Sequence, residues 1–172
     1  MNYDLCELQR RYEQRYLNAI EDQRIIFDAV VSAVKSQSSR LFFIDEPDGT
    51  EKTFVENLIL ARVRSARQIA LAVAFSEIAS ILLNDDRTAH SRFKIPFDIL
   101  QDNICDIKAQ SALAELLRRT VLVIWDEAPA QNRYCFEAVD RTLKDVRQND
   151  QWFGGIVVVF SGNIYFSLIL AN

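Results

Sequence analysis

The 172-residue chain is poor in the residue types that mark several common classes of protein. It has one histidine, His90, and three widely spaced cysteines, Cys6, Cys105 and Cys135, without the spacing of a zinc site. We therefore expect reduced intracellular thiols with no metal or catalytic role. No apolar run reaches the ~18 residues of a membrane span, and the N-terminus is too charged for a signal peptide. The net charge of −4 argues against tight, nonspecific binding of nucleic acid through charge alone.

Glycine is also scarce, and its absence matters most between Leu41 and Thr53. This stretch, LFFIDEPDGTEKT, joins an apolar run suited to a buried strand to an acidic turn, and then Lys52 and Thr53 precede a helical apolar pattern. A phosphate-binding loop occurs in this context, between a strand and a helix that follows Lys-Thr. Its sequence pattern is G-x-x-x-x-G-K-[ST]. Both pattern glycines are absent, because Glu46 and Glu51 occupy their positions. The alternative is an unrelated acidic turn before a helix.

Apolar periodicity predicts strands that alternate with helices along the rest of the chain. After a polar, partly helical lead-in at 3–16, we expect a helix capped by Asn18 that ends near Lys35. Its predicted apolar face comprises Ile25, Ile26, Ala29, Val30, Ala33 and Val34. Further helices are predicted at 54–64, 76–83, 111–119 and 133–147, and strands at 41–44, 69–75, 120–125 and 156–160. We expect a turn at 84–90 and irregular chain at 92–108, where Pro96 breaks any long element.

This alternation predicts a single α/β domain with a parallel sheet covered by helices on both faces. Ligands of such sheets bind at the carboxyl ends of the strands. Four segments should therefore lie along one edge: 46–53, 76–77, 126–127 and 161–166. Among them, Asp126 and Glu127 follow an apolar strand, as in a motif that holds a metal ion and activates water. A strand that ends in Asp-Glu is common by chance, so the dipeptide alone is weak evidence for a metal site. The presence of Lys52-Thr53 upstream strengthens that interpretation.

The chain resembles the Pif-type (petite integration frequency) DNA helicases of superfamily one, which include the helicase portion of Helitron transposons. The matching pieces span about 17–163: LNAIEDQRIIFDAV, FFIDEPDGTEKTF, IALAVAFSEIASILL, RTAHSRFKIP, LVIWDEAP, YCFEAVDRTLKDV and FGGIVVVFSGN. RTAHSRFKIP and WDEAP are the most specific. The resemblance implies a P-loop NTPase fold, a RecA-like three-layer α/β/α domain with a mostly parallel sheet. Residues 17–172 would be the first of two such domains, and 1–16 a helical lead-in.

The resemblance also implies a site for ATP and Mg²⁺. In that site Glu127 would be the general base on the attacking water, with Lys52 as the second catalytic residue. Thr53 and Asp126 would hold Mg²⁺. The implied nucleotide ligands are Gln23, Pro47, Gly49, Thr50, Lys52 and Thr53. Gln23 would read adenine, and the alternative for it is a solvated helix residue.

Single-stranded DNA is the partner that the resemblance implies, with weak binding expected here. The implied contacts are Ser76, His90, Ser91, Arg92 and Lys94. Phe93 and Phe97 could stack on bases, although we interpret Phe93 as a core residue. We expect no membrane association, and either a monomer or a chain that lacks its second helicase domain. A nuclear or mitochondrial location is also implied.

Several departures from the family pattern predict an impaired enzyme. Acidic residues replace glycine in the phosphate loop, at Glu46, Asp48 and Glu51, and in the first DNA-contact motif, at Glu77. Asn163, Tyr165 and Phe166 occupy the Asp, Arg and Gln places of the segment that senses the terminal phosphate. The rival interpretation is a non-catalytic module that binds DNA or protein. A third interpretation is a P-loop nucleotide kinase. The sequence offers neither the lid nor the substrate-binding arginines of such a kinase.

Overall fold

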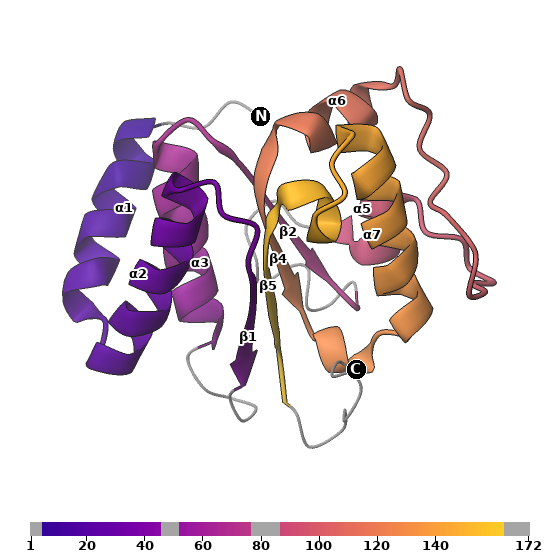
Figure 1. Cartoon of the computed structure of the whole chain (residues 1–172). Helices are drawn as coiled ribbons and strands as arrows, with labels where there is room; N and C mark the ends of the chain where they lie inside the picture. The colour runs from indigo at the N-terminus through magenta and orange to yellow at the C-terminus, as the bar shows by residue number, and fades with distance from the viewer. Residues whose placement is uncertain (1–4, 46–51, 77–86, 164–172) are drawn as a thin grey trace.

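The computed structural model describes residues 5–45, 52–76 and 87–163, which form one parallel sheet between two layers of helices (Figure 1). The sheet has five strands in the order β1-β5-β4-β2-β3. The strands are β1 (Leu41–Asp45), β2 (Ile69–Ala74), β3 (Arg87–Thr88), β4 (Thr120–Asp126) and β5 (Val157–Gly162). All four neighbouring pairs are parallel, which confirms the predicted fold class.

Helices cover both faces of this sheet (Figure 1). One layer holds α1 (Leu5–Asn18), α2 (Glu21–Lys35) and α3 (Lys52–Ser65), and the other holds α5 (Ala89–Phe93), α6 (Ala112–Arg119) and α7 (Arg133–Arg147). Two short 3₁₀ turns, η1 (Ala128–Ala130) and η2 (Trp152–Gly155), precede α7 and β5. Strand β4 shows why both layers are needed, since successive side chains point to opposite faces. Leu122 and Ile124 enter the core under α1–α3, whereas Val123 and Trp125 enter the core under α5–α7.

The start of α2 differs from the prediction. Asn18 ends α1, and α2 begins at Glu21 with Ile20 as its N-cap. Its buried face is also different, because Ile25 and Ala29 are exposed and Phe27 is buried. The cause is an aromatic cluster with α1, in which the Phe27 ring lies 5.8 Å from the ring of Tyr12 and 5.2 Å from that of Tyr16.

The segment predicted as a turn at 84–90 contains a short strand instead. Arg87 and Thr88 pair with Val73 and Ala74 as β3, and the Thr88 hydroxyl then caps α5 by accepting from the Ser91 N–H at 3.2 Å. A strand of two residues has no alternation for a sequence pattern to detect. The predicted helix at 76–83 lies, apart from Ser76, outside the described residues.

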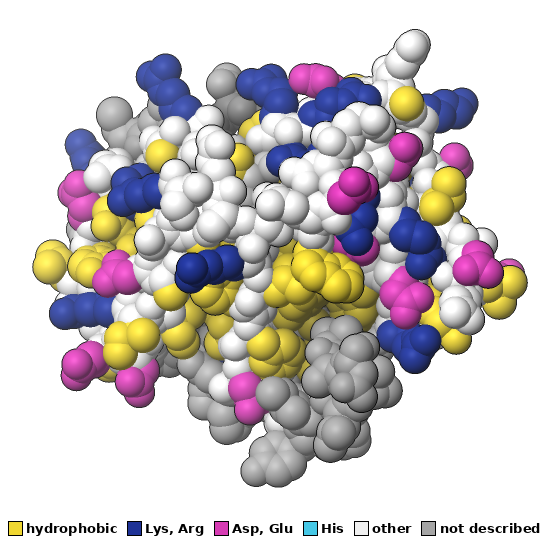
Figure 2. Space-filling view, viewed as in Figure 1, with side chains coloured by type: hydrophobic (Ala, Val, Ile, Leu, Met, Phe, Trp, Pro, Cys, Tyr) yellow, Lys and Arg dark blue, Asp and Glu magenta, His cyan; other side chains and the backbone are white. Residues whose placement is uncertain are grey.

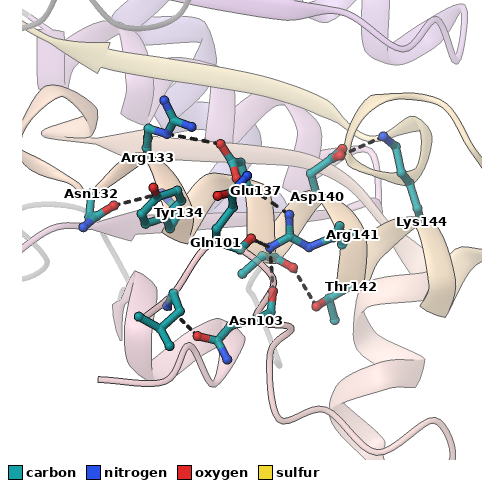
Figure 3. A network of polar contacts seen from close by, with 12 residues as sticks. Gln101, Asn103, Asn132, Arg133, Tyr134, Glu137, Asp140, Arg141, Thr142 and Lys144 are labelled. Carbon is teal, nitrogen blue, oxygen red and sulfur yellow. Dashed lines mark hydrogen bonds and ion pairs between the residues drawn. The ribbon is translucent and has the colours of Figure 1, made fainter. Parts of the chain in front are cut away.

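The connection from Lys94 to Ser111 is mostly irregular, as expected, and α7 holds it in place (Figure 3). The Arg141 guanidinium donates to the carbonyls of Gln101, at 2.6 Å, and Asn103, at 2.7 Å. These two carbonyls lie outside any helix or strand that could supply a backbone donor, and the guanidinium satisfies them instead. The loop after α5 is therefore fixed to the body of the domain.

Candidate functional site

Strand register brings the predicted site segments together at one edge of the sheet. Asp45 at the end of β1 is aligned with Gly162 of β5, and Ala74 at the end of β2 is aligned with Asp126 of β4. Helix α3 begins at Lys52, the first described residue after β1. The prediction of a shared carboxyl edge is therefore confirmed for its described members, 52–53, 76, 126–127 and 161–163. Figure 1 shows this edge at the lower end of the strands.

Asp126 and Glu127 are held at this edge by hydrogen bonds. Asp126 Oδ1 accepts the Glu127 backbone N–H at 2.8 Å, and the Ser161 hydroxyl lies 3.1 Å from the same oxygen. Glu127 has a left-handed backbone, with φ 53° and ψ 32°, a conformation that costs energy and is concentrated at functional sites. Ser76, which lies just beyond the end of β2, donates to Glu127 Oε2 at 3.1 Å. Both carboxylates are thus held from neighbouring strands.

Gly162 lets the chain after Glu127 pack tightly against β5. Its φ is +154°, and a Cβ at this position would lie 2.3 Å from Pro129 Cδ in η1. Any larger residue would push η1 away from the end of β5. The glycine therefore keeps Asp126 and Glu127 at their places on the edge.

Two residues that the sequence analysis did not single out also belong to this site. Glu56 on α3 and Ser161 on β5 are both fully buried, and the Ser161 hydroxyl contacts Glu56 Oε1 as well as Asp126. Two signals could have identified them. Glu56 follows Lys52 by one helical turn, and Ser161 ends an apolar strand as Asp126 does.

The phosphate-loop side of the site is described only from Lys52 onward. Lys52 and Thr53 form the first turn of α3 and are partly buried. A helix N-terminus favours anions, so this turn is suited to a phosphate group. The predicted ligands Pro47, Gly49 and Thr50 lie outside the described residues. So do the departures Glu46, Asp48, Glu51, Glu77, Tyr165 and Phe166.

Gln23 is buried, and it caps a helix. Its Oε1 accepts the Ile20 backbone N–H at 3.0 Å, which satisfies one donor at the start of α2. The interpretation of a solvated helix residue is therefore wrong. Recognition of adenine by the rest of the Gln23 side chain stays a prediction.

Four of the five residues predicted to contact DNA, all but Ser76, lie on or beside α5, which starts after β3. Ser76 instead follows β2 and donates to Glu127. His90 is partly exposed, and Ser91 and Lys94 are exposed, whereas Arg92 is only 8% exposed. Phe93 is a core residue, as we interpreted it, and its ring stacks on Trp125 at 5.5 Å. Phe97 is 93% exposed. Accessibility thus favours Ser91, Lys94 and Phe97 over Arg92 as contacts.

The cysteines with described side chains are uncharged thiols. Cys105 and Cys135 are buried and free. Burial raises the pKa of Cys105 to about 11 and also raises the pKa of Cys135. A nucleophilic thiol needs the opposite shift. Burial lowers the pKa of His90, whose Nε2 lies 4.0 Å from Cys135 Sγ, so this pair is neutral rather than ionic.

The oxygen donors at the edge suit a Mg²⁺ site that water and phosphate complete. They do not suit a metal site in which the protein supplies all the ligands. The described residues contain no cluster of three or more His, Cys, Asp or Glu that could hold an ion. Magnesium in phosphate-transfer sites needs only one or two protein oxygens, with the rest from water and phosphates. The Asp126 carboxylate and the Thr53 hydroxyl offer oxygen donors of that kind, and their role toward Mg²⁺ stays a prediction. Among the described residues, no helix is both long and apolar enough to cross a bilayer.

Comparisons with known proteins agree on one family. The family model for PIF1-like helicase matches residues 18–170. A curated relative, ATP-dependent DNA helicase Pif1 of Psychrobacter sp. (strain PRwf-1), is 28% identical over 125 residues. That match covers 72% of this chain and 19% of the relative.

Solved structures of Pif1 helicases share the fold. The Bacteroides enzyme in complex with ADP-AlF3 and ssDNA has a TM-score of 0.68 and 26% identity, covering 84% of this chain and 32% of that one. Pif1 helicase from Candida albicans has a TM-score of 0.63 and 19% identity, covering 86% and 33%. This chain therefore spans about a third of the solved helicases and a smaller share of the curated one. Since the family model matches nearly the entire chain, this protein belongs to the PIF1-like helicase family.

Proposed function

We propose that this chain is the first RecA-like ATPase domain of a PIF1-type DNA helicase and that its phosphate loop binds ATP weakly. The parent reaction is ATP hydrolysis coupled to 5′-to-3′ translocation on DNA. The observation that carries the proposal is the convergence of Lys52, Asp126 and Glu127 on one edge of a parallel sheet. Pif1 from Bacteroides has been solved with ssDNA and a nucleotide analogue, which supports both ligands for this family.

In this proposal each edge residue has a defined role. Lys52 and the first turn of α3 bind the terminal phosphates. Asp126 and Thr53 hold Mg²⁺, which when bound neutralises charge on the phosphates. Glu127 accepts the proton of the attacking water, and the Ser76 hydroxyl, which donates to Glu127 Oε2, orients that carboxylate.

The acidic loop weakens this site through electrostatics. A carboxylate about 5 Å from a phosphate charge costs about 3 kcal/mol at an effective dielectric near 20. That is about a hundredfold in affinity for each close pair. Glu46, Asp48 and Glu51 stand in the loop immediately before Lys52. The loss of glycine also removes backbone freedom that lets the chain approach phosphates.

The experiment is calorimetry of Mg-ATP binding to the chain and to a variant in which Glu46, Asp48 and Glu51 are all glycine. We expect weak or undetectable binding by the unmodified chain and measurable binding by the triple variant. Adding Lys52→Ala to the triple variant is the control, and it should abolish the binding gained. Hydrolysis should stay very slow, because in this proposal the chain is tested as an isolated first domain, without a second domain to supply an arginine finger. Such arginines contribute roughly 10³ to 10⁵ in rate in related enzymes.

Two results would contradict the proposal. DNA-stimulated phosphate release by the unmodified chain would exclude an impaired site. A triple variant that still binds no nucleotide would place the defect outside the three acidic side chains, and it would favour a module without nucleotide chemistry.

A further inference from the structure

The connection between α5 and α6 leaves large apolar side chains in solvent. Leu100 is 69% exposed and Ile104 is 64% exposed. The same stretch also reaches the core, because Ile99 packs against it and Cys105 is buried. Figure 1 shows the connection along the outer side of the layer that holds α5, α6 and α7. Leu100 and Ile104 thus stay outside although their neighbours are packed.

Hydrogen bonds hold this exposed stretch in one conformation. The Asn103 N–H donates to the Leu100 carbonyl at 3.2 Å, and the Leu100 N–H donates to Asn103 Oδ1 at 2.5 Å. This turn reverses the chain, so Ile104 returns towards Leu100. Arg141 on α7 fixes the turn by donating to the Asn103 carbonyl at 2.7 Å (Figure 3). A surface that is formed before binding loses little conformational entropy when a partner docks.

Acidic side chains are interspersed with the two apolar ones. Asp98, Asp102 and Asp106 are all exposed, and none is in an ion pair with a described residue. Residues 97–107 include no lysine or arginine. Acidic and apolar side chains lie side by side on the right-hand side of Figure 2, where Figure 1 places this connection. Such a surface repels a phosphate backbone and attracts a cationic protein surface.

We propose that Leu100, Ile104 and the three aspartates form a docking surface for a basic amphipathic helix of another protein. The apolar face of that helix covers Leu100 and Ile104, and its lysine or arginine side chains pair with the aspartates. A helix suits this surface better than an added strand, because a helix satisfies its own backbone groups. A second copy of this chain is disfavoured as the occupant by its net charge of −4. The proposal does not depend on nucleotide binding.

The test is an NMR titration of the isotope-labelled chain with a synthetic amphipathic helix built from leucine and lysine. We expect amide shifts confined to 98–106. Replacing Leu100 and Ile104 together by serine should lower the affinity at least about tenfold, since the contacts of two apolar side chains are lost. The matched control is Leu17→Ser at the end of α1, where the side chain is 75% exposed, and it should leave the affinity unchanged.

The aspartates are tested by charge. Changing Asp98, Asp102 and Asp106 together to asparagine should weaken binding of the helix and reduce its dependence on salt. Asp28→Asn, at an exposed position on α2, is the control and should do neither. All these positions are exposed, and unchanged amide shifts in β4 verify that each variant keeps its fold.

Three results would overturn the proposal. Shifts spread over the domain, or an equal loss from Leu17→Ser, would show binding without a dedicated surface. Weaker binding of a labelled single-stranded oligonucleotide by the double serine variant would assign the surface to DNA; Phe97, a predicted DNA contact, is left unchanged in that variant. Loss of a dimer in analytical ultracentrifugation on introducing the same two changes would assign the surface to a second copy of the chain.

Discussion

His90 lies between an exposed aromatic ring and a buried thiol. Its ring stacks on Phe97 with 6.1 Å between centroids, and its Nε2 lies 4.0 Å from Cys135 Sγ. Burial lowers the pKa of His90, and no carboxylate is within ion-pair distance of it among the described residues. The folded protein therefore prefers the neutral imidazole at this position.

The shift in the pKa of His90 predicts how stability changes with pH. The unfolded chain protonates this histidine near pH 6.5, whereas the folded protein does so at lower pH. Below about pH 6.5 the unfolded state binds more protons, so the free energy of unfolding should fall as the pH falls. Urea unfolding from about pH 5 to pH 8 measures this effect. His90→Gln should reduce the slope in that window, and an unchanged slope would contradict the prediction.

At the residue scale, the sequence predicted side chains that sit in local patterns. Lys52-Thr53 and Asp126-Glu127 each follow a strand within a recognisable motif, and they reach the expected edge. The spacing of Glu56 from Lys52 is a local signal, but its contact with Ser161, 105 positions away, could not be predicted from a local pattern. A hydrogen bond between distant positions leaves no periodic signal in the sequence.

Among the elements, Arg147 connects the end of α7 to two other parts of the chain. Its Nη1 lies within 3.0 Å of the carbonyls of Leu117, Arg118 and Thr120, at the end of α6. Its Nε donates to the Gly154 carbonyl in η2 at 2.6 Å. The last carbonyls of a helix have no partner within the helix. Arg147 therefore caps α6 from a neighbouring helix.

Replacing Arg147 should destabilise this layer of the domain. Arg147→Ala leaves several carbonyls without a charged donor, at an expected cost of about 2 to 3 kcal/mol in the free energy of unfolding. Arg147→Lys should recover only part of that, because an ammonium group lacks the planar fork of guanidinium. Urea denaturation measures both. Arg119→Ala, at an exposed position on the end of α6, is the control and should change stability by less than about 0.5 kcal/mol.

The elements that sequence predicted well have strong local signals. The bounds predicted for α7, 133–147, match the structure, and Ser111 caps α6 by accepting the Ala114 N–H at 3.1 Å. Helix α2 begins later than predicted, at Glu21, with the apolar Ile20 at its N-cap and the Gln23 side chain accepting the Ile20 N–H. Strand β3 exists only through pairing with β2. Tertiary contacts decide where a helix such as α2 begins and whether a strand as short as β3 forms. Apolar periodicity in the sequence carries no information on either.

At the scale of the whole molecule, charge limits what the domain can bind alone. The net charge is −4, and on the face in Figure 2 the Lys and Arg side chains are interspersed with Asp and Glu rather than gathered in one patch. The chain spans 19% of its curated helicase relative. Tight DNA binding in the proposed parent protein would therefore draw on surfaces beyond this domain.

This charge distribution predicts weak, strongly salt-dependent binding of single-stranded DNA by the isolated chain. For single strands, log affinity falls with log salt by about 0.7 per neutralised phosphate. Lys94 is exposed at the end of α5, near the carboxyl edge, and Lys94→Glu should weaken binding and lower that slope. Lys35→Glu makes the same charge change at the end of α2, before β1 begins, and should have a smaller effect. Fluorescence anisotropy with a labelled oligonucleotide across a salt series measures both. Submicromolar affinity at physiological salt, or equal losses from the two variants, would contradict the prediction and favour a dedicated DNA-binding module.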